Sequence, residues 1–332
     1  MAVSHHSSIA ALDKPVFRRL LLSWYAQSQR KLPWRGTTDP YHILVSEIML
    51  QQTRVAVVEE RYTKFIAQFP SAERLARAKE ATVLAAWSGL GYYRRARALH
   101  GAAKEIVQGG SFPRTALELM ELPGVGRYTA CAVASIAFGE PVAVVDGNVK
   151  RVIDRLLNSK AAPAESNAEK HYWEIAGQLL DGQSPGDFNQ AMMELGALVC
   201  LPGQPMCHAC PVAHLCGARG PTEKAARPAR LKAELHYALA RRNGSVLLRQ
   251  RNKQSSLMAA MWELPEIEAP GKPNKIPLLK LRHSITTTDY TVFVHDGKNK
   301  KRQTDRWVPL RSVYRLPLTG LTRKIIRGLG DA

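Results

Sequence analysis

Two carboxylates stand where they could cleave a glycosidic bond. Glu47 lies in a helical pattern that starts at Asp39-Pro40, a pair whose capping side chain and fixed φ favour a helix start. On that helix Glu47 shares a face with Ile43 and Leu50, which predicts partial desolvation. Desolvation raises a carboxyl pKa, so Glu47 could donate a proton to a leaving base. By spacing alone, an edge position on an amphipathic helix explains this residue at least as well.

The second carboxylate, Asp146, stands where the apolar run PVAVV ends and a helical pattern begins. It is expected to cap that helix, whose free N–H groups and positive end stabilise an anion. Taken alone, Asp146 is better explained as a plain N-cap than as a catalytic group. Taken together, the two environments would push two carboxyl pKa values apart, as glycosidic cleavage requires. Glu47 could then supply the proton for the base and Asp146 the anion beside the sugar cation.

Four cysteines lie within seventeen residues, at Cys200, Cys207, Cys210 and Cys216, with the spacing C-x6-C-x2-C-x5-C. Four soft thiolates on one compact loop predict a metal site. Their chemistry alone allows either a tetrahedral zinc ion or an iron-sulfur cluster. The fifth cysteine, Cys131, is expected to be a small buried thiol.

A glycine turn precedes Asp146 by about twenty residues, in the segment LPGVGRYT. Gly124 and Gly126 permit positive φ and expose backbone N–H groups at a helix start, which suits a phosphate. Such turns join many helices, so the motif gains weight only from the segment VDGNVKR that follows it.

These residues must be positioned by a largely helical first part of the chain. Helical spacing runs from about residue 13 to residue 220, and 332 residues are enough for two domains. The stretch 221–234, rich in Pro, Ala and basic residues, is the expected linker. Over 235–332 we expect short strands at Leu235–Arg242, Ser245–Gln250 and Asp289–His295, and a basic amphipathic helix at Leu318–Leu329. This predicts a small α+β domain.

The chain carries a formal net charge of +19, which favours a polyanionic partner such as nucleic acid. A merely basic solvated surface is the alternative, and charge says nothing about base specificity. We expect no secretory signal and no transmembrane span, because no apolar stretch is long enough. Five cysteines without an export signal argue against a disulfide framework.

The LPGVG hairpin followed by Asp146 resembles the endonuclease III superfamily of base-excision glycosylases. Within it, the segments SEIMLQQT at 46–53 and GLGYYRRARALH at 89–100 resemble the MutY-type adenine glycosylases. The resemblance implies an all-α helix-hairpin-helix glycosylase domain with an iron-sulfur cluster loop, plus a smaller α+β Nudix-like C-terminal domain. It implies a 4Fe-4S cluster and double-stranded DNA with adenine mispaired with 8-oxoguanine or guanine. We expect a cytoplasmic, bacterial-type monomer associated with the nucleoid through DNA.

The resemblance also implies roles for individual residues. Bifunctional relatives carry Lys where this chain has Tyr128, which cannot form a Schiff base, so a monofunctional enzyme is implied. Glu47 would protonate the adenine and Asp146 would stabilise the sugar cation, while Tyr128 and Asn148 position charge and water. The implied substrate contacts are Arg35 and Glu194 near the adenine, the phosphate-facing Gly124 and Gly126, and Leu50, Gln51, Gln52 and Tyr92 as wedges and opposite-strand probes.

The stretch 235–267 resembles the Nudix-like domain of adenine glycosylases, without the carboxylate-rich helix that a magnesium-dependent hydrolase needs. The family reads 8-oxoguanine through a Phe-Ser-His loop, where this chain has Ile285, Thr286 and Thr287. The missing His leaves the preference for 8-oxoguanine over guanine open. Polar contacts to the opposite base are expected from Arg282, His283, Ser284 and Thr286.

Two other functions stay open as alternatives. Tyr128 also fits the thymine-mispair glycosylases, so a thymine-mispair or oxidised-pyrimidine enzyme is the first alternative. The second is a non-catalytic DNA-binding iron-sulfur protein, against which the intact Glu47 and Asp146 argue.

The cluster loop of many relatives carries basic residues, whereas Leu201–Met206 has none. Lys150 and Arg151 are therefore expected to take more of the phosphate contact.

Overall fold

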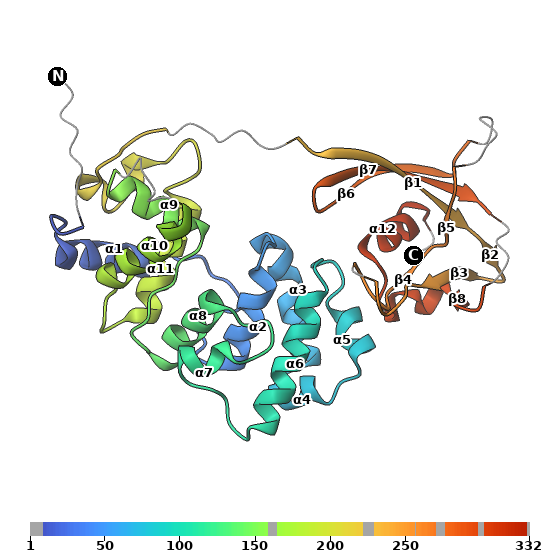
Figure 1. The fold of residues 1–332 in the computed structure, drawn as a ribbon, viewed down its shortest axis with the longest axis horizontal. Coiled ribbons are helices and arrows are strands. Elements are labelled where there is room, and N and C mark those ends of the chain that lie inside the picture. The colour runs from blue at the N-terminus through green and yellow to red at the C-terminus, as the bar shows by residue number, and fades with distance from the viewer. Residues whose placement is uncertain are drawn as a thin grey trace. The chain divides into compact units, whose positions relative to one another are not determined.

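The computed structural model describes residues 9–158, 165–221, 229–255, 257–269, 276–297 and 302–330, and the chain divides into two compact units (Figure 1). The first comprises the described residues of Met1–Ile66, Ser71–Glu73 and Gly101–Ala226, and the second those of Ala67–Pro70, Arg74–His100 and Arg227–Ala332. Half of the linker expected at 221–234, residues 222–228, lies outside the described residues. The periodicity of the sequence does not reveal that Arg74–His100 groups with the C-terminal part.

The described residues up to 220 are mainly helical, as predicted. They are α1 (Lys14–Ser28), α2 (Pro40–Leu50), α3 (Val55–Gln68), α4 (Ala72–Ala76), α5 (Glu80–Ala86), α6 (Arg94–Gln108), α7 (Ala116–Met120), α8 (Arg127–Phe138), α9 (Gly147–Leu156), α10 (Glu165–Leu179) and α11 (Pro185–Leu198), with 3-10 turns η1 (Cys207–Ala209) and η2 (Ala213–Leu215). No helix of the described residues is long and apolar enough to cross a membrane.

Aspartate caps fix the starts of three helices that position the site. Asp13 accepts a hydrogen bond from the Val16 amide at the start of α1. Asp39 accepts from the first amides of α2, and Asp146 does the same for α9. A side-chain acceptor satisfies donors that the helix itself leaves free, so each short polar residue sets where its helix begins. The predicted caps at positions 39 and 146 are confirmed.

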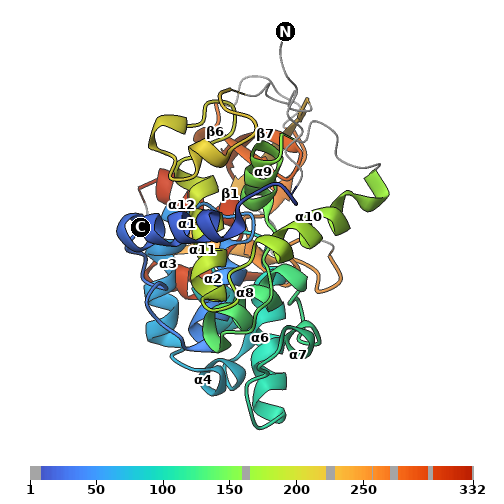
Figure 2. The same cartoon turned by 90° about the vertical axis from the view of Figure 1, so that its left-hand side faces the viewer.

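Helix α11 lies against its neighbours at two glycines. Helices α2, α8 and α11 lie together in both views of the fold (Figure 1 and Figure 2). A Cβ at Gly186 would lie 2.7 Å from the Ser135 carbonyl oxygen of α8, and a Cβ at Gly196 would lie 2.6 Å from the Asn148 Cβ of α9. Only glycine permits this approach, which holds α9 and its cap beside α11.

We therefore expect Gly196→Ala to force α9 away from α11. The substitution should lower the free energy of unfolding by roughly 1–3 kcal/mol and slow any chemistry that uses Asp146 or Asn148. Thermal unfolding and single-turnover rates measure both effects. Gly177→Ala in α10 is the matched control, because its added Cβ would meet nothing within 4 Å. Equal behaviour of the two variants would contradict the close-packing argument.

The second unit carries two small sheets around one apolar core. Its strands are β1 (Leu231–Leu239), β2 (Arg241–Arg242), β3 (Ser245–Gln250), β4 (Trp262–Glu263), β5 (Glu266–Ile267), β6 (Leu279–Ile285), β7 (Thr288–Asp296) and β8 (Asp305–Pro309). One sheet has the order β5-β1-β7-β6, with β1 and β7 parallel. The other has the order β2-β3-β4, with β8 paired to β3. The predicted α+β region is confirmed.

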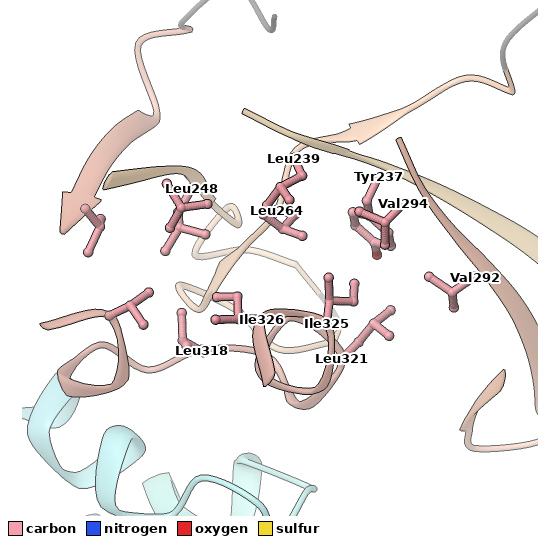
Figure 3. Close-up of a cluster of buried hydrophobic side chains, with 13 residues drawn as sticks. Tyr237, Leu239, Leu248, Leu264, Val292, Val294, Leu318, Leu321, Ile325 and Ile326 are labelled. Carbon is pink, nitrogen blue, oxygen red and sulfur yellow. The ribbon is translucent and has the colours of Figure 1, made fainter. Parts of the chain in front are cut away.

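The core of this unit lies between the sheets and α12 (Gly320–Gly328), which follows η3 (Leu310–Arg315). Figure 3 shows Leu321, Ile325 and Ile326 of α12 facing strand residues such as Leu239 and Val294. Alternate residues of β1 and β7 point into this cluster, as the two-residue period of a strand dictates. The basic C-terminal helix expected from the sequence therefore serves as a core element.

Candidate active site

A cavity of about 590 Å³ opens in the first unit beside α2, α8, α9 and α11. That volume lies in the range of pockets that hold small molecules, so a single nucleobase fits. The structure brings together at its wall most of the residues predicted for substrate contact and chemistry, namely Arg35, Glu47, Leu50, Gln51, Gln52, Tyr128, Asp146, Asn148 and Glu194.

Glu47 is buried in the wall of this cavity, with 6% of its surface exposed. Burial raises the pKa of its carboxyl to about 7, although the Tyr128 hydroxyl and the Arg35 charge lower it, and Asp146 adds to the rise. Its Oε2 atom accepts no hydrogen bond from the described residues. The carboxyl is therefore substantially protonated near neutral pH, as the sequence argument predicts for a general acid.

This raised pKa predicts how stability depends on pH. The folded pKa of Glu47 exceeds its ordinary 4.5, so the contribution of the protonated carboxyl is fully present below about 4.5 and is lost as the pH rises through about 7. Glu47→Gln should therefore stabilise the protein at pH 8, by up to about 3 kcal/mol, and change little at pH 4.5. Urea unfolding of both proteins at the two pH values measures the difference. An equal effect at both pH values would contradict the raised pKa.

Tyr128 lies beside Glu47 on the first turn of α8. Its hydroxyl is 3.2 Å from the Met193 sulfur. Burial, together with the carboxylates of Glu47 and Asp146, holds the pKa of Tyr128 well above its ordinary value. The phenol therefore stays protonated and can donate a hydrogen bond into the cavity, but it offers no amine for a Schiff base.

Asp146 faces the same cavity from the N-terminus of α9. Its Oδ1 atom accepts from the Asn148 amide at 2.9 Å and from the Val149 amide at 2.8 Å. Its Oδ2 atom accepts from the Asn148 side chain at 2.8 Å. Donors to both oxygens fix the direction of the carboxylate. The buried carboxyl of Glu47 and the capping carboxyl of Asp146 thus line one cavity.

Arg151 connects this end of α9 to the cysteine loop. Its Nη2 atom donates to the Asn148 Oδ1 at 2.8 Å and to the Gly196 carbonyl at 2.7 Å, and its Nε atom donates to the Cys200 carbonyl at 2.7 Å. These bonds hold the guanidinium against the protein and connect α9 to α11 and to the cysteine loop. Lys150 likewise forms an ion pair with Glu169.

Glu194, on α11, anchors a charged network that the sequence reveals only in part. It is 1% exposed and accepts from the Arg30 amide at 3.0 Å, from the Arg30 side chain at 2.8 and 2.7 Å and from Arg35 at 3.2 Å. Burial would raise its pKa, but the hydrogen bonds and charges of the two arginines lower it overall. Arg35 also donates to the Tyr25 hydroxyl.

Because a carboxylate has about four acceptor positions, these bonds fill Glu194. It therefore holds two guanidinium groups at the wall and leaves Arg35 to present its remaining donors to the cavity. Arg30 and Tyr25 were missed from the sequence, since their partners are more than a hundred residues away or bear no motif.

The C-terminal end of α2 lines the cavity. The Gln51 side-chain amide donates to the Thr129 hydroxyl at 3.1 Å. Gln52 is exposed and adopts a positive φ of 52°, a conformation that non-glycine residues rarely take. The residues expected as wedges therefore line the cavity, on a backbone that turns sharply at Gln52.

Other predicted residues lie away from the cavity. Gly124, with a φ of +74°, and Gly126, the cap of α8, form the turn of the helix-hairpin-helix between α7 and α8, as expected. Tyr92 belongs to the second unit and does not line the cavity.

The residues expected to read the opposite base cluster on the β6–β7 hairpin of the second unit. Thr286 occupies its turn with a φ of 48°, and its hydroxyl donates to the Ile285 carbonyl at 2.8 Å. The Ser284 hydroxyl donates to Asp289 at 2.6 Å. Arg282 is exposed, while burial and the Lys324 charge lower the pKa of His283. The hairpin thus presents a neutral imidazole, one guanidinium and hydroxyls that its own chain orients.

The four cysteines share one neighbourhood after α11. Burial and the charges of Cys200, Cys216 and Cys207 raise the pKa of Cys210 to about 11, despite a backbone hydrogen bond that lowers it. Arg155 donates to the Cys200 sulfur at 3.2 Å. Across the described part of the chain, no three Cys, His or acidic side chains are arranged around a single ion. Four thiolates on one loop suit either a tetrahedral zinc ion or an iron-sulfur cluster.

Comparison with known proteins supports the helical part of the fold. Residues 45–178 match the family described as HhH-GPD superfamily base excision DNA repair protein. The adenine DNA glycosylase of Rattus norvegicus is 50% identical over 217 residues, 62% of this chain and 42% of the relative. That of Homo sapiens is 47% identical over 232 residues, 67% of this chain and 42% of the relative. The chain therefore spans less than half the length of these relatives.

Solved structures match the same part. The structure of a thermostable thymine-DNA glycosylase is 34% identical, with a TM-score of 0.56, over 61% of this chain and 94% of that one. A trapped endonuclease III–DNA covalent intermediate matches with a TM-score of 0.52 and 24% identity, over 62% of this chain and 96% of that one, which shows a shared fold. The resemblance drawn from the hairpin and the catalytic segments is confirmed.

Proposed function

The chain belongs to the HhH-GPD superfamily of base excision DNA repair proteins, and on that premise we propose that it is a monofunctional adenine DNA glycosylase. The observation that carries the proposal is the buried Glu47, with a pKa of about 7, in one cavity with the capped carboxylate of Asp146. One group can give a proton and the other can offer a carboxyl to the sugar, which are the two roles that glycosidic cleavage needs.

The reaction follows from these positions. An adenine flipped out of the duplex enters the cavity at a cost of a few kcal/mol of lost stacking. Glu47 protonates a ring nitrogen, which makes the base a better leaving group as the bond to the sugar breaks. The Asp146 carboxylate stabilises the oxocarbenium-like sugar, and water then adds to it. Asn148 holds the direction of that carboxylate, and Tyr128 leaves the DNA backbone intact because it forms no Schiff base.

The Arg30–Glu194–Arg35 network supplies hydrogen-bond donors for a flipped base. Glu194 has its acceptor positions filled by the arginines, so the cavity wall presents cationic donors rather than a free acceptor. The unprotonated ring nitrogens of adenine can accept hydrogen bonds from such donors. Arg35 is thus the residue that we assign to base recognition.

The remaining assignments extend the proposal. The four cysteines would hold a 4Fe-4S cluster, which when bound fixes the loop after α11, to which Arg151 and Arg155 bind. The Nudix-like region of 235–332, after a linker at 221–234 and a glycosylase domain at 13–220, would read the base opposite adenine without hydrolase activity. The protein would act as a cytoplasmic monomer on double-stranded DNA.

A thymine-mispair glycosylase is the second candidate, because the similar solved structure is described as a thymine-DNA glycosylase. The test is single-turnover base release from duplexes with A opposite 8-oxoguanine, A opposite G, T opposite G and a thymine glycol pair. We expect adenine release from the first two and none from the others. Thymine release in preference to adenine would support the second candidate, and binding without any release would indicate a non-catalytic protein.

A further inference from the structure

The loop that carries Tyr92 holds this side chain outward in an unusual conformation. Tyr92 is 52% exposed and has a φ of 44°, between α5 and α6. The Arg95 guanidinium lies 5.5 Å from the Tyr92 ring and 5.6 Å from the Trp87 ring, and it donates to the Leu90 carbonyl at 2.9 Å. Such backbone strain persists only where surrounding contacts fix it, and it concentrates at functional positions.

The next residue, Tyr93, ties this loop to the C-terminal part of the same unit. Tyr93 is buried, and its hydroxyl donates to the Leu318 carbonyl at 3.2 Å. Leu318 is fully buried in the apolar core of the second unit (Figure 3). Thr319, directly after it, caps α12. A buried hydrogen bond therefore joins the Tyr92 loop to the start of α12.

Arg97 makes a second connection one helical turn later. Its Nη2 atom donates to the Ala259 carbonyl at 2.6 Å, and its Nε atom forms an ion pair with Glu80 of α5 at 2.9 Å. On either side of Ala259, Met258 and Ala260 have positive φ values of 50° and 58°. The loop before β4 is thus bent around the point where Arg97 binds it.

Helix α12 also contacts the β6–β7 hairpin, which we assign to the base opposite the adenine. Lys324 donates to the Arg282 carbonyl of β6 at 2.8 Å. A Cβ at Gly328 would lie 3.3 Å from the side chain of Leu279, the first residue of that strand. Contacts therefore run without a gap from the Tyr92 loop through α12 to β6.

We infer that the C-terminal region positions Tyr92, through Tyr93 and Arg97, so that Tyr92 and the β6–β7 hairpin probe the strand opposite the flipped base as one body. Tyr93 and Arg97 are positioning residues in this arrangement, because they act on DNA only through Tyr92. The inference rests on the proposed function for the role of Tyr92, and on the contacts within the second unit for the coupling.

The test is a double-mutant cycle on DNA binding, which needs no turnover. Affinity is measured for a duplex with a tetrahydrofuran abasic analogue opposite 8-oxoguanine, using the wild type, Tyr92→Ala, the pair Tyr93→Phe with Arg97→Ala, and all three changes together. We expect Tyr92→Ala and the pair each to weaken binding about fivefold, and the triple variant to bind no more weakly than Tyr92→Ala. Hydrogen exchange of the 88–94 segment should be faster in the pair variant.

Tyr314→Phe is the control, because the buried Tyr314 hydroxyl has no hydrogen-bond partner among the described residues. It should bind as the wild type does. Additive losses in the triple variant, wild-type binding by Tyr92→Ala, or wild-type binding by the pair variant would each overturn the inference. Failure of the wild type to release adenine would instead count against the proposed function, while the binding cycle would still report on the coupling.

Discussion

Replacing Asp146 with Asn is expected to slow base release by about a hundredfold to a thousandfold while leaving lesion-DNA affinity within about threefold. Asn keeps an oxygen for the amides of Asn148 and Val149, and it caps helices as well as Asp does, so α9 should stay in place. What disappears is the negative charge beside the developing sugar cation. Phosphate contacts, which supply most of the affinity for DNA, are untouched.

Single-turnover kinetics and equilibrium binding to the abasic-analogue duplex separate the two effects. Asp39→Asn is the matched control, because Asp39 caps α2 in the same way but does not line the cavity. That variant should retain the wild-type rate. A loss of binding as large as the loss of rate would show that Asp146 acts through the fold or through DNA contact, and not through its charge.

Replacing Glu47 with Gln is expected to slow base release by about a hundredfold to ten-thousandfold, the usual value of a positioned general acid. The amide has nearly the same shape but no acidic proton. In the wild type the rate should fall as the pH rises through about 7, because the protonated carboxyl is then lost. The residual rate of Glu47→Gln should not show that fall.

Rates measured between pH 5 and pH 9 test this prediction. Glu60→Gln on α3 is a suitable control, since Glu60 is exposed and lies outside the cavity. If Glu47→Gln kept the wild-type rate, or kept the same decline above pH 7, then another group would have to supply the proton.

The local features of the site could be predicted from the sequence. A helix cap depends on residues two or three positions away, so the sequence around Asp39 and Asp146 is enough to predict that each caps a helix. The face that Glu47 shares with apolar neighbours is likewise set by one helical turn. The turn at Gly124 follows from the same short-range rules, because its φ of +74° suits glycine.

The long-range parts could not be predicted in this way. Arg30 binds Glu194, which lies 164 residues away in the sequence, and Arg97 binds the Ala259 carbonyl, which lies 162 residues away. No pattern in the sequence around either arginine predicts its partner. The grouping of Arg74–His100 with the C-terminal part depends on such contacts. The inward hydrogen bonds of Arg151 also escape the sequence, where a basic residue on a helix looks like a phosphate ligand.

The central claim is that this cavity removes adenine by protonation and leaves the DNA strand intact. Mass spectrometry of a single-turnover reaction on an A opposite G duplex, run with and without borohydride, tests it most directly. The account predicts free adenine, an unbroken strand with one abasic site, and no protein–DNA adduct. Release of another base, a cleaved strand or a trapped adduct would contradict it.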